Sequence, residues 1–243
     1  MSEIKLYNDD CINLLKNIKD KTIDLICTDI PYELENHGGT NSALATRCAK
    51  MRDSVEFMAN GIDYEKVFSE FIRICKIPNM AIFCSNLQIG KILTFFNSRN
   101  LKTELLVWEK LNPAPLCNGK YISDLEYIVY VHDKGSCFNN DAPFEFKKKC
   151  KMYPIVVSND KVHPTQKPLK LIEELVTVHS FENQLVLDPF MGSGSCGIVC
   201  ASKNRNFIGV ELDENYYNIA KKRIEESRSE EHTSELQSLN SIS

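Results

Sequence analysis

A strand, a glycine-rich loop, a helix and a second strand follow one another near the C-terminus, and this order restricts the possible folds most. Leu185-Val186-Leu187 is a short apolar run typical of a buried strand, and residues 188–197 read DPFMGSGSCG. A helix is predicted after Gly194, and the next apolar run, Phe207–Val210, is followed by Glu211. Because a strand–helix–strand unit with a short connection builds a parallel sheet, the chain is predicted to be an α/β protein.

Strand and helix patterns alternate along most of the chain. In the clearest helix, Tyr64 to Cys75, apolar side chains recur at helical spacing after the capping residue Asp63. Further helices are predicted over 11–18, 88–98 and 168–180 and from Glu214 onward, and strands over 4–7, 22–28, 80–84, 104–108 and 126–131. Such alternation predicts a doubly wound, mostly parallel sheet.

Two polar stretches lack periodicity, residues 33–61 and 133–162. Long irregular loops inside compact domains are usually functional, so both are predicted to be functional loops inserted in the domain. Without a second apolar core pattern or an internal repeat, residues 1–227 are predicted to form a single domain.

The last sixteen residues, 228–243, have a different origin in our interpretation. Arg228 to Ser238 reads RSEEHTSELQS, which matches the conceptual translation of a common short-read sequencing adapter, and the following residues fit a barcode and the adapter's next constant bases. We predict an assembly artefact that is disordered, and expect the true C-terminus beyond Ser227 to be missing. Removing its one Arg and three Glu changes the formal charge from −4 to −2.

The ten cysteines include no C-x-x-C pair. Five of them lie inside apolar patterns, which predicts reduced, buried thiols and no metal site: Cys27, Cys75, Cys84, Cys196 and Cys200. No run approaches the roughly 20 apolar residues of a membrane span, and the N-terminus lacks a signal-peptide core. We therefore expect a cytoplasmic protein.

The glycine-rich loop predicts a nucleoside-ligand site, because glycines allow close backbone approach and the helix N-terminus offers free N–H groups. Gly192-x-Gly194-x-x-Gly197 satisfies the dinucleotide fingerprint, and Glu211 stands 211 − 192 = 19 residues on. An NAD-dependent oxidoreductase is thus an alternative. It is weakened because Asp188-Pro189-Phe190 occupies the turn and only one strand and one helix follow.

A second motif, Asp29-Ile30-Pro31-Tyr32, directly follows the apolar run 22–28. Ligands of open α/β sheets bind at the carboxyl ends of the strands, so a carboxylate and an aromatic ring there indicate a site. An ordinary Asp-x-Pro turn is the alternative.

Together these motifs resemble the S-adenosylmethionine-dependent DNA amino-methyltransferases, over about residues 4–223. His163-Pro164-Thr165-Gln166-Lys167-Pro168 strengthens the resemblance, and the segments 108–112 and 126–128 also recur there, although a core strand pair explains them equally well. Because the tetrapeptide precedes the glycine-rich loop, the order resembles the permuted β group. The resemblance implies a class I methyltransferase fold, Rossmann-like with a circularly permuted motif order, of bacterial or phage origin.

The resemblance also implies residue roles. Asp29 and the Ile30 carbonyl would accept hydrogen bonds from the target amino group, Pro31 would fix the backbone, and Tyr32 would stack on a flipped-out base. For the cofactor S-adenosylmethionine, Asp10 would face the adenine, Glu211 the ribose, and Asp188 and Lys167 the methionine end; His163 could instead cap its helix. The full predicted cofactor set is Asp10, Cys11, His163, Lys167, Pro168, Asp188, Pro189, Phe190, Gly192, Gly194, Glu211 and Leu212.

Adenine N6 is the preferred acceptor over cytosine N4, because the tetrapeptide begins with Asp, although Ile30 departs from the usual proline. RNA or protein-amide methylation and an inactive DNA-binding protein are further alternatives. The expected partners are DNA and a cognate restriction endonuclease, and the protein is a monomer or a homodimer. One dense basic run could contact phosphates or form a solvated edge: Lys147, Lys148, Lys149 and Lys151.

Overall fold

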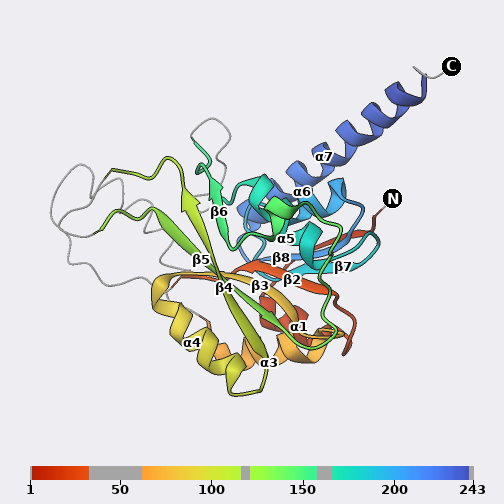
Figure 1. Ribbon diagram of the computed structural model, residues 1–243. Coiled ribbons are helices and arrows are strands. Elements are labelled where there is room, and N and C mark those ends of the chain that lie inside the picture. The colour runs from red at the N-terminus through yellow and green to blue at the C-terminus, as the bar shows by residue number, and fades with distance from the viewer. Residues whose placement is uncertain (1, 33–61, 116–120, 158–165, 241–243) are drawn as a thin grey trace.

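The computed structural model describes residues 2–32, 62–115, 121–157 and 166–240, with side chains to Ser229 in the last segment (Figure 1). The strands are β1 (Ile4–Asn8), β2 (Leu25–Asp29), β3 (Asn79–Cys84), β4 (Lys102–Lys110), β5 (Leu125–His132), β6 (Cys150–Tyr153), β7 (Leu185–Asp188) and β8 (Asn206–Glu211). The helices are α1 (Cys11–Asn17), α3 (Tyr64–Ile74), α4 (Asn86–Asn97), α5 (Leu169–His179), α6 (Ser195–Ser202) and α7 (Glu214–Asn240), with a 3₁₀ turn η1 (Phe144–Lys147).

The described strands form one sheet in the order β1-β8-β7-β2-β3-β5-β4-β6. All neighbours are parallel except β5, which runs antiparallel to both β3 and β4. Strands β7 and β2 are parallel neighbours; the chain continues from β2 to β3 on one side and from β7 to β8 on the other. Such a switch point opens a crevice beyond the carboxyl ends of the two strands.

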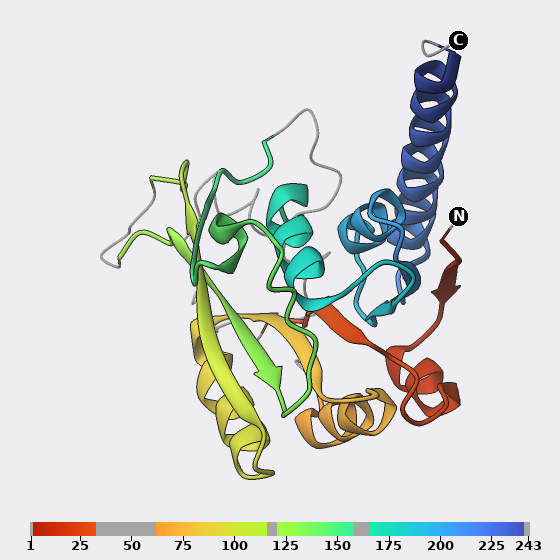
Figure 2. The same cartoon turned by 45° about the vertical axis from the view of Figure 1, so that its right-hand side comes forward.

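Helices cover both faces of the sheet, α1, α3 and α4 on one and α5, α6 and α7 on the other (Figures 1 and 2). One buried cluster joins the sheet to α3 and α4 through residues such as Phe68, Phe71 and Phe96. The other joins it to α5, α6 and α7 through Leu175, Val199 and Ile224. The predicted α/β class and doubly wound sheet are confirmed.

The predicted helices and strands are all present, with ends shifted by no more than three residues. Asp29 is the last residue of β2, as expected. Residues 33–61 lie outside the described part of the chain. In the other stretch, 133–162, the absence of regular structure was wrong, because η1 and the edge strand β6 lie within it.

Strand β6 escaped detection because its polarity is inverted. Lys151 faces inward and is 2% exposed, whereas Met152 faces outward and is 55% exposed. A four-residue strand with a buried lysine carries no apolar alternation from which it could be read.

Helix α7 continues to Asn240, so the expected disorder of residues 228–240 is contradicted at the level of backbone conformation. Its distal half projects away from the body of the protein (Figures 1 and 2). Extending an existing helix avoids the cost of nucleation, and the Glu, Ser, Leu and Gln residues there tolerate helix. The adapter origin of the segment stays a prediction. No helix in the described part of the chain is long and apolar enough to span a bilayer.

Candidate active site

A cavity of about 710 Å³ lies at the switch point, beyond the ends of β2 and β7. The Thr28 hydroxyl of β2 donates to Asp188 Oδ1 of β7 at 2.7 Å and links the two strand ends. We call the region around Asp10, Asp188 and Glu211 the cofactor half and the region around Asp29 and Tyr32 the substrate half, after the roles predicted from the sequence.

Backbone amides hold the three carboxylates of the cofactor half. Glu211 accepts from the N–H groups of Gly192 and Asp213, both at 2.9 Å. Asp188 Oδ1 also accepts from Phe190 N–H at 3.2 Å, and Asp10 caps α1 through Ile12 N–H at 2.8 Å. Each acid is therefore fixed in direction by residues close in sequence or on the adjoining strand.

Burial raises the pKa of Asp188 to about 7, even though Thr28 and the Phe190 amide lower it. Burial also raises the pKa of Glu211. Ser195 Oγ is buried in the cavity wall with no hydrogen-bond partner among the described residues. Buried carboxylates and a buried hydroxyl without a partner need hydrogen-bond donors. S-adenosylmethionine brings such donors in its hydroxyl, amino and ammonium groups.

The substrate half is held by charges. Lys167 Nζ lies 2.5 Å from Asp29 Oδ2, 3.2 Å from Glu126 Oε2 and 3.1 Å from the Tyr32 hydroxyl. Glu126 accepts from the same hydroxyl at 3.1 Å and pairs with Lys110 at 3.0 Å. Asp29 Oδ1 is buried without a hydrogen-bond partner within the described residues.

The charges shift the pKa values of this cluster in different directions. Burial raises the pKa of Asp29, and Lys167 offsets only part of that rise. Burial is also the largest influence on Glu126, but Lys167 and Lys110 together bring its pKa below the usual value. The two carboxylates raise the pKa of Lys167 against its own burial, so the ammonium stays charged.

Two further contacts fix the tetrapeptide backbone. The buried amide of Gln88 donates to the Pro31 carbonyl at 2.8 Å, while Ser85 N–H donates to Gln88 Oε1 at 3.0 Å. Ile30 is 1% exposed within the core cluster of α3 and α4, so it fills space where the usual proline would stand. The Ser85-x-x-Gln88 capping box was the sequence signal by which Gln88 could have been found.

The structure gathers most of the predicted cofactor residues around the cavity. Lys167 lines it too, but its ammonium contacts the substrate tetrapeptide. Pro168 and Gly194 do not line it; they form the N-caps of α5 and α6. His163 lies outside the described residues. The cavity-lining residues of the predicted set are Asp10, Cys11, Lys167, Asp188, Pro189, Phe190, Gly192, Glu211 and Leu212.

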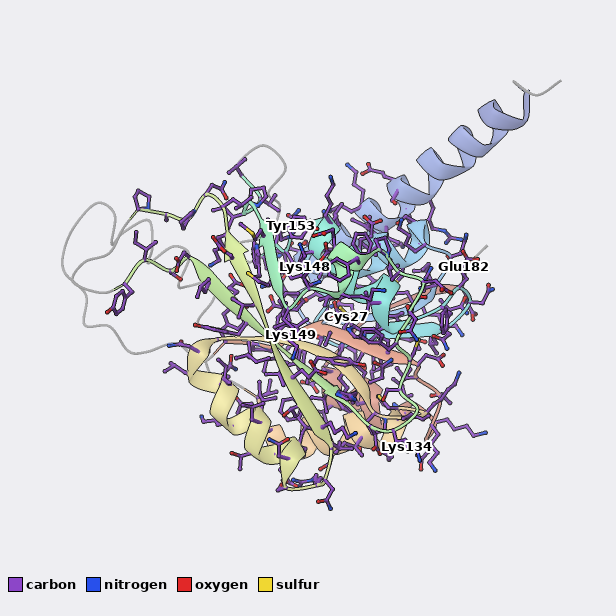
Figure 3. All side chains as sticks on the ribbon, in the orientation of Figure 1. Cys27, Lys134, Lys148, Lys149, Tyr153 and Glu182 are labelled. Carbon is purple, nitrogen blue, oxygen red and sulfur yellow. The ribbon has the colours of Figure 1, made fainter. Side chains whose placement is uncertain are left out.

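The basic run is largely used within the protein. Lys151 forms a buried ion pair with Glu174 at 2.8 Å, so its predicted contact with DNA is contradicted. If Lys151 turned toward DNA, the buried Glu174 carboxylate would lose its counter-ion. Lys148 and Lys149, labelled in Figure 3, directly precede Cys150 of β6 and are exposed. Lys149 pairs with Glu104 of β4 at 2.7 Å. Lys147 donates to the Asn140 carbonyl at 2.7 Å.

The cysteines expected inside apolar patterns are all buried and free: Cys27, Cys75, Cys84, Cys196 and Cys200. Burial raises the pKa of Cys75 and of Cys84 to about 12, so these thiols stay protonated. Among the described residues, no group of three His, Cys, Asp or Glu side chains is arranged to hold a metal ion.

A doubly wound sheet with an antiparallel strand β5, and a cavity joining an acidic cofactor half to an Asp-x-Pro-Tyr motif, define a class I methyltransferase. The family model of N6/N4 methyltransferases, described as DNA methylase, matches residues 23–222. The chain belongs to this family of DNA methylases, which confirms the resemblance and overturns the oxidoreductase alternative.

The relatives and solved structures agree with this family. The chain is 30% identical over 239 residues to the Type II methyltransferase M2.LlaDCHI of Lactococcus lactis subsp. cremoris, covering 90% of this chain and 88% of that protein. It is 29% identical to M2.MboI of Moraxella bovis, covering 91% and 87%. The crystal structure of the M1.HpyAVI–SAM complex superposes with a TM-score of 0.65 at 29% identity, covering 90% and 99%.

Proposed function

We propose that this DNA methylase transfers the methyl group of S-adenosylmethionine to the N6 amino group of adenine in DNA. The observation that carries the proposal is Asp29 Oδ1, a buried carboxylate oxygen in the cavity wall without a hydrogen-bond partner among the described residues. A buried unpaired acceptor is costly, and an incoming amino group would satisfy it.

The cofactor half suits the three polar parts of the methyl donor. We assign Asp10 to the adenine amino group, Glu211 to the ribose hydroxyls and Asp188 to the methionine ammonium; all three line the cavity. When bound, the donor supplies an electrophilic methyl group on a sulfonium. An ammonium beside Asp188 would favour its ionised form, which burial alone disfavours.

The substrate half prepares a poor nucleophile. The adenine amino lone pair is delocalised into the ring, and a hydrogen bond from that group to Asp29 draws the nitrogen toward tetrahedral geometry. The target base must leave the DNA stack to reach the cavity, with the Tyr32 ring as its stacking surface. Both Tyr32 and Asp29 are anchored by Lys167, so the acceptor and the stacking surface keep a fixed relation.

The reaction balances within this cluster. As the nitrogen–carbon bond forms, the carbon–sulfur bond breaks and its electron pair stays on sulfur. The methylated nitrogen then carries an extra proton, which passes to the Asp29 carboxylate and later to water. Because its pKa is raised, Asp29 accepts this proton more readily than an ordinary carboxylate does.

The relatives M2.LlaDCHI and M2.MboI are Type II methyltransferases, so we propose that this enzyme also protects DNA from a cognate restriction endonuclease. Recognition of the DNA sequence is assigned to residues 33–61 and 133–162. The exposed Lys148 and Lys149, together with the half-buried Lys147, would supply phosphate contacts in the second segment.

Nucleoside mass spectrometry of DNA from cells that express the full chain tests the proposal. Wild type should add N6-methyladenine, Asp29→Ala should add none, and the surface control Glu65→Gln should match wild type. Cytosine methylation would move the assignment to N4. Labelled-methyl transfer to RNA or protein but not to DNA, or no transfer at all by wild type, would refute it.

A further inference from the structure

Lys167 bridges two carboxylates that come from different strands. Asp29 ends β2 and Glu126 belongs to β5, and strand β3 separates them in the sheet. The Lys167 ammonium is 5% exposed and lies 5.4 Å from the centre of the Phe83 ring of β3. A buried cation shared in this way divides its charge between the two acids.

The cluster is balanced as a whole. Asp29 and Glu126 supply two negative charges, and Lys167 and Lys110 supply two positive ones. If Glu126 were absent, Lys167 would have Asp29 as its remaining carboxylate partner within the cluster. A carboxylate held by a full ammonium is a weaker acceptor for a neutral amino group and a weaker proton acceptor.

We propose that Glu126 is a positioning residue: it shares Lys167 and the Tyr32 hydroxyl so that Asp29 stays available to the target amino group. This inference rests on the proposed function. Glu126 contacts neither substrate nor cofactor in this assignment; it acts through Lys167 and Tyr32. Lys110 is the second counter-ion of Glu126, which Lys167 also keeps ionised.

The pH dependence of methylation separates this role from simple structural support. Glu126 raises the pKa of Asp29 and Lys167 lowers it, so losing Glu126 should move the acid limb of the kcat profile to lower pH. Losing Lys110 leaves the negative charge of Glu126 less compensated and should move that limb to higher pH. Among the described residues, the other charged or titratable groups near Asp29 are Lys167, Tyr32, Asp188, Cys27 and Cys84.

The experiment measures single-turnover methylation of DNA by the full chain across pH, with cofactor affinity measured separately by calorimetry. Glu126→Gln should lower kcat about 10- to 100-fold, less than loss of the acceptor itself, with cofactor affinity unchanged. The acid limb of its kcat profile should move to lower pH, and that of Lys110→Met should move to higher pH. Glu173→Gln, which removes a surface carboxylate paired with Lys203, should change neither.

Each outcome decides a specific claim. An inactive wild type refutes the proposed function. An active wild type with Glu126→Gln within twofold of it overturns the inference. A loss of kcat with an unshifted acid limb, or shifts of the same sign in both variants, also overturns it, because both results describe a structural role.

Discussion

The two halves of the cavity are organised by different forces. In the cofactor half, Glu211 and Asp188 are oriented by backbone N–H groups of the adjoining loops. In the substrate half, Asp29 is oriented by Lys167, which lies 138 residues away, and Lys167 in turn by Glu126. The first half is thus built from neutral hydrogen bonds, mostly to nearby backbone with the Thr28 hydroxyl as a distant donor, and the second from long-range charges.

This difference predicts different responses to mutation. A local hydrogen bond to backbone can be lost without disturbing other elements, and its net contribution is modest. A buried ion cluster responds as a unit, because removing one member leaves another charge without compensation. Single substitutions in the cofactor half should therefore weaken cofactor binding moderately, whereas those in the substrate half should lower the methylation rate strongly.

The largest effect is expected for Asp29→Asn. The amide keeps the shape but loses the charge that attracts the amino group and accepts its proton, so methylation should fall about 1000-fold. Cofactor affinity, measured by calorimetry, should change less than threefold, roughly 0.7 kcal/mol. A comparable loss of cofactor binding would contradict the division into two halves.

Glu211→Gln should act on binding instead. The amide retains one acceptor oxygen but presents N–H groups toward the amides of Gly192 or Asp213, so the ribose site is weakened. We expect cofactor affinity to fall about 10- to 100-fold, or about 1.4 to 2.7 kcal/mol. At saturating cofactor the methylation rate should return to near that of wild type, and a persistent defect would argue against a pure binding role.

Gly194→Ala should destabilise the loop. Gly194 has φ +78°, and an added Cβ would lie 2.9 Å from the Ala220 Cβ of α7. We expect a loss of about 1 to 3 kcal/mol in the free energy of unfolding, measured by urea denaturation. Gly90→Ala is the matched control: it lies within α4 with nothing within 4 Å, and should stabilise by up to about 1 kcal/mol. Equal effects at both sites would be inconsistent with the tight loop.

Asp188→Asn should show how much stability the protein loses when the buried Asp188 carboxylate ionises. The folded-state pKa of Asp188 is raised from 3.8 to about 7, so the folded protein binds the proton more tightly than the unfolded chain does. Its ionisation therefore destabilises the fold increasingly as pH rises from about 4 to about 7. The variant should be more stable than wild type by up to about 4 kcal/mol at pH 8 and equal at pH 4, by thermal denaturation. A pH-independent difference would rule out this linkage.

The sequence was most informative where a function is carried by neighbouring residues. The loop from Asp188 to Gly194 and the acid at Glu211 could be read together, because one strand–loop–helix–strand unit determines their geometry. The position of Asp29 at a strand end followed from the apolar run before it. Strand β6 was missed because burial of Lys151 depends on Glu174, a partner on another element.

What the sequence by itself determined is the α/β class, the family motifs and the two strand ends that bear Asp29 and Asp188. Their physical basis is local: apolar periodicity, glycine conformation and capping act within about ten residues. Only the tertiary structure decided that Lys167 belongs to the substrate half and that Glu126 shares it with Asp29. Ion pairs between distant elements depend on sheet order and burial, which no local pattern encodes.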